Sequence, residues 1–261
     1  MNTQAAPLVF ITGASSGIGQ ALALRFARAG WRLALVARRG AELQAWADAQ
    51  GLTGEQVSVH AADVRDVPAI VEAGRRCVAQ QGLPDVVVAN AGISIGMETA
   101  DFDDLEVMRA TFETNNLGMA ATFHPFVAAM RERGSGCLVG IASVAGIRGL
   151  PGHGAYCASK AAAISYCESL RGECAPSGVK VVTILPGYID TPLTRGNRYS
   201  MPFLMPADAF ADRAYAAIVA GDSYRVIPWQ MGWVVKLLRL LPNALFDRAF
   251  AKRQRKRRQA R

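Results

Sequence analysis

Tyr156 and Lys160 are four residues apart, and Ser143 lies thirteen positions before the tyrosine. In a helix, the phenol and the ammonium would lie on one face, one turn apart. A tyrosine stays protonated to about pH 10, but a neighbouring cation or the positive end of a helix favours the phenolate. Such a phenol can transfer protons near neutral pH, and a serine hydroxyl nearby could hold the oxygen to which the proton moves. Taken alone, each residue also fits ordinary packing.

A glycine-rich turn, TGASSGIG over residues 12–19, follows the first apolar run and opens the first helical pattern. Its glycines allow a tight turn, a close approach of the backbone to a pyrophosphate, and packing of the helix on the sheet. The start of the helix presents free N–H groups to an anion. A purely structural turn is the alternative, but the position after a strand and before a helix favours dinucleotide binding.

Short apolar runs alternate with helix-length segments along the chain. Continuous apolar runs are typical of parallel strands that are buried on both faces. The alternation predicts an α/β fold, a single-domain, Rossmann-like, doubly wound parallel sheet of about seven strands flanked by helices. The expected strands are 8–11, 33–37, 57–61, 86–90, 137–141, 179–185 and 224–227. The expected helices are 18–29, 42–50, 67–81, 102–133 (with a break), 156–175 and 207–220.

The net charge of +8 is concentrated at the C-terminus. Residues 252–261 hold seven Lys and Arg residues and no acid, which leaves +1 for everything before them. We expect these residues to form a disordered basic tail after an apolar, amphipathic helical extension over 229–251. The extension is too short to span a bilayer, but with the tail it suits the surface of an anionic membrane. Packing on its own domain or on a subunit is the alternative. The tail lacks interleaved aromatics, so we expect no nucleic-acid partner.

The five cysteines are an odd number without framework spacing, and the three histidines are scattered. They indicate reduced thiols and no metal site. The N-terminus has neither a cationic segment nor a long apolar run, so we expect no secretory signal and a cytoplasmic location, with any membrane contact peripheral and at the inner face.

Six motifs occur in a fixed order and together resemble one family. They are TGASSGIG (12–19), Asn90-Ala91-Gly92, Asn115-x-x-Gly118, Ser143, Tyr156-x-x-x-Lys160 and Pro186-Gly187-x-x-x-Thr191. Over about residues 7 to 228 the chain resembles a short-chain dehydrogenase/reductase of the short, single-domain type. The resemblance implies that residues 1–228 form an NADP-binding, Rossmann-like catalytic domain, and that the protein is a homo-oligomer.

The end of the second strand indicates the coenzyme. An NAD site usually places an acid there, whereas this chain has Ala37-Arg38-Arg39. An arginine can bind the 2′-phosphate of NADP(H) through paired, charge-assisted hydrogen bonds. The sequence therefore favours NADP(H) over NAD(H), with Arg38 the main contact and Arg39 secondary. A solvated arginine is the alternative. The glycine-rich turn and the resemblance together imply the other coenzyme-binding residues, which are Gly13, Ser15, Ser16, Gly17, Ile18, Gly19, Asp63, Val64, Asn90, Ala91, Gly92, Tyr156, Lys160, Pro186, Gly187, Ile189 and Thr191.

The resemblance also implies catalytic roles. Tyr156 would exchange a proton with the substrate oxygen, and Lys160 would lower the pKa of the phenol. Ser143 would hydrogen-bond that oxygen, and Asn115 would hold a water that connects Lys160 to solvent. We therefore expect an NADP(H)-dependent oxidoreductase that interconverts a carbonyl and a secondary alcohol. An epimerase or dehydratase on the same scaffold and a nucleotide-sensing binding protein are the alternatives.

Three loops above the strand ends, 94–97, 144–153 and 188–205, should set the substrate specificity. Their apolar residues favour a largely apolar substrate. Arg148 and His153 could touch a polar end of it or be merely solvated. The apolar loop residues are Ile95, Met97, Ile147, Leu150, Tyr188, Leu193, Met201, Phe203, Leu204 and Met205.

Overall fold

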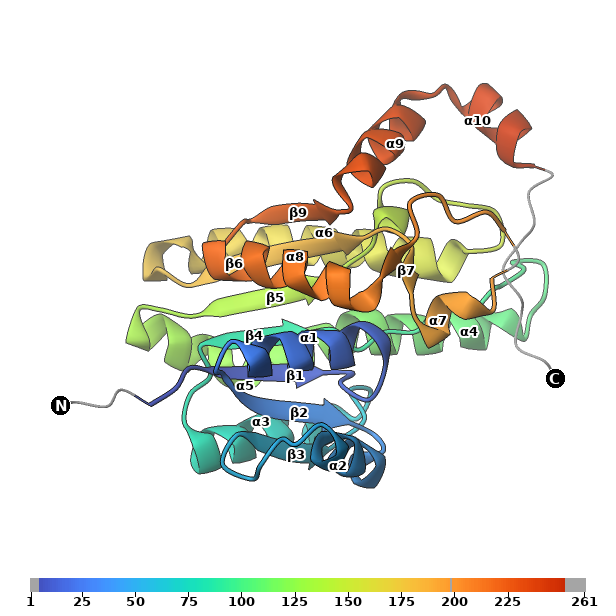
Figure 1. Cartoon of the computed structure of the whole chain (residues 1–261). Coiled ribbons are helices and arrows are strands. Elements are labelled where there is room, and N and C mark those ends of the chain that lie inside the picture. Colours follow the sequence, from blue (N-terminus) through green and yellow to red (C-terminus); the bar gives the residue numbers. More distant parts are fainter. Residues whose placement is uncertain (1–4, 198, 252–261) are drawn as a thin grey trace.

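The computed structural model describes residues 5–197 and 199–251, and the predicted basic tail (252–261) lies outside them. Its centre is a seven-stranded parallel sheet, as predicted, with the strand order β3-β2-β1-β4-β5-β6-β9 (Figure 1). A small two-stranded sheet pairs β7 with β8. The strands are β1 (Leu8–Thr12), β2 (Arg32–Ala37), β3 (Val57–Ala61), β4 (Val86–Ala89), β5 (Cys137–Ile141), β6 (Lys180–Pro186), β7 (Ile189–Asp190), β8 (Met205–Pro206) and β9 (Tyr224–Ile227).

Helices cover both faces of the large sheet and make two separate cores. Successive residues of β1 alternate between them, because side chains of a strand point to opposite faces. Val9 and Ile11 pack in one core, Leu8 and Phe10 in the other. The first core contains residues of α1 (Gly17–Arg28), α2 (Gly40–Ala49) and α8 (Ala207–Ala220). The second contains residues of α3 (Val67–Gln81), α5 (Gly118–Arg133) and α6 (Gly154–Cys174).

The sheet order reverses beside β1, which has β2 on one side and β4 on the other. In doubly wound sheets such a reversal opens a crevice at the carboxyl ends of the strands, where ligands bind. Asn90, directly after β4, ties the two strand ends together. Its side-chain amide donates to the carbonyl oxygens of Thr12 (3.0 Å) and Gly13 (3.2 Å).

The break expected within residues 102–133 is a change of helix type. A short helix, α4 (Asp104–Phe112), continues through a π-helical turn over Glu113–Leu117 into α5. A π turn adds a residue to one turn and is frequent at functional sites. Here it carries Asn115, whose side chain is buried.

The expected helical stretch over 229–251 is two helices, α9 (Trp229–Leu240) and α10 (Asn243–Phe250). Pro242 separates them, because a proline has no N–H to donate and disfavours a helical residue before it. Both helices extend from the β9 edge of the molecule, outside the layers that cover the sheet (Figure 1). Among the described residues, no helix is long and apolar enough to cross a membrane.

Candidate active site

Tyr156 and Lys160 lie in the first two turns of α6, which begins at Gly154. Their spacing puts them on one face of the helix, and the Lys160 Nζ is 5.9 Å from the centre of the Tyr156 ring. Lys160 is buried, and its ammonium donates a hydrogen bond to the carbonyl oxygen of Ile141 at the end of β5 (2.8 Å). The start of the helix therefore holds the phenol while the sheet holds the ammonium.

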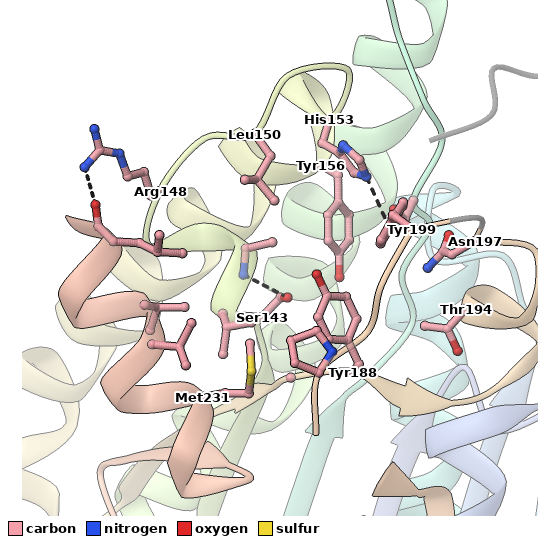
Figure 2. Close-up of a pocket in the computed structure, with 18 of the residues that line it drawn as sticks. Ser143, Arg148, Leu150, His153, Tyr156, Tyr188, Thr194, Asn197, Tyr199 and Met231 are labelled. Carbon is pink, nitrogen blue, oxygen red and sulfur yellow. Dashed lines mark hydrogen bonds between the residues drawn. The ribbon is translucent and has the colours of Figure 1, made fainter. Parts of the chain in front are cut away.

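Ser143 comes two residues after the end of β5 and caps a short 3-10 helix (Val144–Gly146). Its hydroxyl accepts a hydrogen bond from the Ala145 N–H (3.1 Å). Figure 2 shows Ser143 and Tyr156 pointing into the same hollow. The sheet end and the helix start thus bring together the hydroxyl and the phenol that are thirteen residues apart in sequence.

Burial sets the protonation behaviour of both titratable groups. It raises the pKa of the Tyr156 phenol, although a hydrogen bond with Ser143 acts in the opposite direction. It lowers the pKa of the Lys160 ammonium to about 8. Burial, rather than the charge of Lys160, therefore decides the direction of the phenol's pKa in this structure. The phenol is protonated at neutral pH and suited to donate.

The side chain of Asn115 is buried and makes three hydrogen bonds. Its amide donates to the Ile93 carbonyl (3.0 Å) and to the Ser159 hydroxyl (2.9 Å), and its Oδ1 accepts from the Ile93 N–H (2.9 Å). These bonds join the π turn to α6 and to the segment after β4. The structure thus gives Asn115 a positioning contact with the residue next to Lys160.

The glycine-rich turn fits a pyrophosphate. Gly13 and Gly17 have positive φ values (66° and 54°), which glycine adopts without strain. The Ser16 side chain makes no capping hydrogen bond at the start of α1, so the first N–H groups of the helix face the cleft without that partner. A Cβ on Gly19 would lie only 2.2 Å from the Gly13 carbonyl oxygen. This close packing holds the N-terminus of α1 against the turn, where Gly17 and Ile18 line the cleft.

The two arginines after β2 differ in their surroundings. Arg39 forms an exposed ion pair with Glu42, with 2.8 Å between Nε and Oε2. Arg38 has no ion pair with a carboxylate in the described residues, and nearby Asp63 is bound by Arg65 at 2.9 Å. Burial acts to raise the pKa of Asp63, but the hydrogen bonds and charge of Arg65, together with the charge of Arg38, lower it below its usual value. Arg65 was missed from the sequence, although it lies just after β3, the strand beside β2.

One cleft of about 500 Å³ collects nearly all of the expected coenzyme residues. It runs from the arginines, over the glycine-rich turn, to Tyr156 and Lys160. Gly19 and Asn115 do not line it: Gly19 packs beneath the turn, and the buried Asn115 side chain is bonded to Ile93 and Ser159. The expected residues that line the cleft are Gly13, Ser15, Ser16, Gly17, Ile18, Arg38, Arg39, Asp63, Val64, Asn90, Ala91, Gly92, Ser143, Tyr156, Lys160, Pro186, Gly187, Ile189 and Thr191.

A second, mostly apolar hollow of about 160 Å³ adjoins the cleft (Figure 2). Ser143 and Tyr156 line both, so they lie where the two meet. One wall consists of apolar residues of α9 and α10. This wall was not expected from the sequence, in which residues 229–251 form an extension separate from the predicted site. Its members are Met231, Val234, Val235, Leu238, Phe246 and Phe250.

The three loops expected to set specificity contribute only in part. Ser94, Leu150, Tyr188 and Leu193 line the hollow, as do Arg148 and His153. The expectation was wrong for the other apolar loop residues. Met97 and Met205 are buried elsewhere, Ile147 packs against the core, and Phe203 and Leu204 are exposed. Ile95 and Met201 do not line the hollow either.

Arg148 and His153 line the hollow, but both side chains also have partners within the protein. The His153 Nε2 is 3.4 Å from the Tyr199 hydroxyl, and Arg148 binds the end of α9 (Figure 2). Within residues 5–197 and 199–251, no group of three or more His, Cys, Asp or Glu side chains is arranged to hold a metal ion.

Comparison with known proteins gives one consistent family. The model of the short chain dehydrogenase family matches residues 7–201. An uncharacterized oxidoreductase of Myxococcus xanthus is 42% identical over 242 residues, which cover 92% of this chain and 94% of the relative.

Solved structures agree. A short-chain dehydrogenase of Streptomyces avermitilis superposes with a TM-score of 0.79 at 26% identity, covering 96% of this chain and 95% of the other. A short-chain dehydrogenase of Sphingobium yanoikuyae in complex with NADPH gives a TM-score of 0.77 at 27% identity, covering 91% and 97%.

Proposed function

Because the chain belongs to the short-chain dehydrogenase/reductase family of oxidoreductases, we propose that it is an NADP(H)-dependent enzyme that interconverts an apolar carbonyl compound and its secondary alcohol. The observation that carries this proposal is the position of Tyr156 and Ser143. Both side chains line the polar cleft and the apolar hollow, which supports a coenzyme in the cleft and a substrate in the hollow that would meet beside them.

The protein's own groups handle the proton and the developing charge. A bound nicotinamide supplies or accepts the hydride. As the carbonyl carbon becomes tetrahedral, negative charge grows on its oxygen, and the Ser143 hydroxyl stabilises it by donating a hydrogen bond. The Tyr156 phenol gives its proton to that oxygen, which completes the alcohol, and the reverse reaction returns the proton.

Lys160 supports this proton transfer. Once Tyr156 has donated its proton, a phenolate remains in a buried place, and the ammonium on the same face of α6 stabilises it. The Ile141 carbonyl and the π turn around Asn115 keep α6 and Lys160 in position.

The choice of NADP(H) over NAD(H) rests on the cations beside β2. Arg38 lines the cleft without the ion pair that occupies Arg39, whereas Arg65 lines the same cleft paired with Asp63. The related Sphingobium yanoikuyae enzyme was solved with NADPH, which is consistent with this choice. An arginine binds a 2′-phosphate through paired, charge-assisted hydrogen bonds.

The substrate class rests on the lining of the hollow. The lining is mainly aliphatic and aromatic, and two of its polar members, Arg148 and His153, have partners within the protein, so an apolar carbonyl compound is favoured over a charged one. The same proposal includes a homo-oligomer and a cytoplasmic location. The location is supported by five free, buried cysteines.

The direct test is an NADPH-oxidation screen over aldehydes and ketones of increasing chain length, with NADH in parallel. We expect reduction that improves with apolar length and prefers NADPH. Tyr156→Phe should lower the rate by about 10²–10⁴-fold, the usual contribution of a positioned general acid. Tyr166→Phe is the matched control, because Tyr166 lies on the same helix but stacks on Phe123 away from the hollow.

A wild-type rate in Tyr156→Phe would show that the proton comes from elsewhere. If no carbonyl is reduced, but NADPH binds tightly and a hydroxy compound is epimerised or dehydrated, the alternative enzymes on this scaffold would replace the proposal. Tight NADPH binding with no turnover of any kind would favour a nucleotide-sensing protein.

A further inference from the structure

Helix α9 has two apolar faces. The inner face, with Met231, Val235 and Leu238, lines the hollow beside Tyr156. The outer face carries large apolar side chains four, eight and eleven positions apart, a spacing that places them on one side of a helix. They are Trp229 (64% exposed), Trp233 (67%), Leu237 (65%) and Leu240 (80%).

On α10, Leu245 is also exposed (57%). Single exposed apolar residues are ordinary on protein surfaces, but four large ones on one side of a helix mark a contact site. Neither helix needs this face for packing on the domain, because the inner residues Met231, Val235 and Phe246 are the ones buried. The outer face therefore fits a partner outside the chain.

The charge of the sequence segment that carries the outer face indicates which kind of partner. Residues 229–261 contain ten Lys and Arg residues and a single acid, Asp247, which gives +9. Subtracting this from the net charge of +8 leaves −1 for residues 1–228. The exposed apolar face thus belongs to the one strongly cationic part of the chain. A second copy of the chain would bring the same charge and be repelled.

An anionic lipid surface complements both properties. Lys236 lies on the outer face with its Nζ 5.3 Å from the Trp233 ring. Tryptophan rings favour the headgroup level of a bilayer, and a long lysine side chain reaches from apolar surroundings to the phosphates. We propose that the outer face of α9, together with Leu245, docks onto an anionic lipid bilayer. This docking does not depend on the reaction catalysed in the hollow.

Flotation of the full-length protein with lipid vesicles tests the proposal. One set contains phosphatidylcholine only, and the other also contains about one third phosphatidylserine. We expect binding to the anionic vesicles, little binding to the neutral ones, and release at high salt, because salt screens the attraction between cations and an anionic surface. Tryptophan fluorescence should shift to shorter wavelength on binding, since Trp229 and Trp233 enter the interface while Trp31 and Trp46 pack against the core.

The variant Trp233→Glu/Leu237→Glu should reduce binding to anionic vesicles at least tenfold. Its control is Phe102→Glu/Val219→Glu, which adds the same charge at exposed apolar residues (83% and 54%) outside the extension and should bind as the wild type does. The single variant Leu240→Glu provides a second test, because a side chain that is 80% exposed can be changed without disturbing the fold.

Three results would overturn the proposal. The first is failure of the wild type to float with anionic vesicles at low salt. The second is wild-type binding by both Trp233→Glu/Leu237→Glu and Leu240→Glu. The third is an equal loss of binding in the control Phe102→Glu/Val219→Glu. Analytical sedimentation without lipid tests the competing partner, a second copy of the chain. The outer face would belong to a second copy if the wild type formed dimers and bound no vesicles, and if Trp233→Glu/Leu237→Glu dissociated those dimers.

Discussion

The guanidinium group of Arg148 donates a hydrogen bond to the carbonyl oxygen of Leu241, 2.7 Å away, just after the end of α9. The same group also donates to the Leu238 carbonyl oxygen and to Asn243 Oδ1, and it stacks at 3.9 Å on the Phe246 ring. The last carbonyls of a helix have no partner within it and carry partial negative charge, so a cation there is favourable. Arg148 thus fastens α9 and α10 to the loop that follows Ser143.

Replacing Arg148 should loosen the wall of the hollow. In Arg148→Ala we expect the KM for a long apolar substrate to rise about tenfold, with a smaller change in kcat, because the proton-transfer groups keep their places. Hydrogen exchange over residues 238–251 should quicken in the same variant. Arg171→Ala, an exposed change in the last turn of α6, is the control. An unchanged KM and unchanged exchange would show that the two helices hold their position without Arg148.

The buried ammonium of Lys160 should leave a signature in the pH dependence of stability. Its pKa is lowered by burial from 10.5 to about 8. Between these two values the unfolded chain binds the proton and the folded chain does not, so the free energy of unfolding rises with pH. Below about pH 8 both states are protonated, and the cost of burying the charge is fully present.

The measurement compares the wild type with Lys160→Met, without added coenzyme, by urea unfolding at about pH 7 and about pH 9.5. Relative to the variant, the wild type should gain roughly 2 kcal/mol over this range. Other titrating groups cancel in the difference. A difference that stays constant would show that the ammonium keeps its ordinary pKa in the fold.

Arg38 and Arg39 form a natural pair of matched variants. Arg38→Ala should raise the KM for NADPH by about 10- to 100-fold and leave that for NADH nearly unchanged, because the lost hydrogen bonds are to a phosphate that only NADPH carries. Arg39→Ala should have a much smaller effect, since its guanidinium is paired with Glu42. Equal effects on both coenzymes would remove Arg38 from the selectivity site.

Two glycines should respond to alanine in opposite directions. A Cβ on Gly19 would meet the Gly13 carbonyl oxygen at 2.2 Å and the Asn90 amide at 2.8 Å, so Gly19→Ala should lower the free energy of unfolding by about 1–3 kcal/mol and weaken NADPH binding. A Cβ on Gly172, in the exposed part of α6, meets nothing within 4 Å, so Gly172→Ala should stabilise by about 0.5–1 kcal/mol. Thermal unfolding of both variants provides the check.

The parallel sheet was predictable because each strand is a continuous apolar run and each crossover is a helix-length segment, both of which are local patterns. The meeting of Tyr156, Lys160 and Ser143 followed from the resemblance and from the four-residue spacing. Arg65 had a usable signal that was missed, since the strands before Arg38 and Arg65 are neighbours in such a sheet.

The wall formed by α9 and α10 could not be predicted in this way. It depends on contacts between Arg148 and residues 90 or more positions later, and no local pattern encodes such a distance. The sequence did show that residues 229–250 are apolar. It did not show that their apolar residues form two opposite faces, one on the hollow and one in solvent.

The last two helices of the chain complete one wall of the hollow beside Tyr156, whereas Ser143, Tyr156 and Lys160 all precede them in sequence. This wall and the groups proposed to move the proton are thus encoded in separate stretches of the gene. Under the proposed function, mutations or exchanges confined to the codons for residues 229–250 would give descendants a new substrate range while the inherited reaction stays intact.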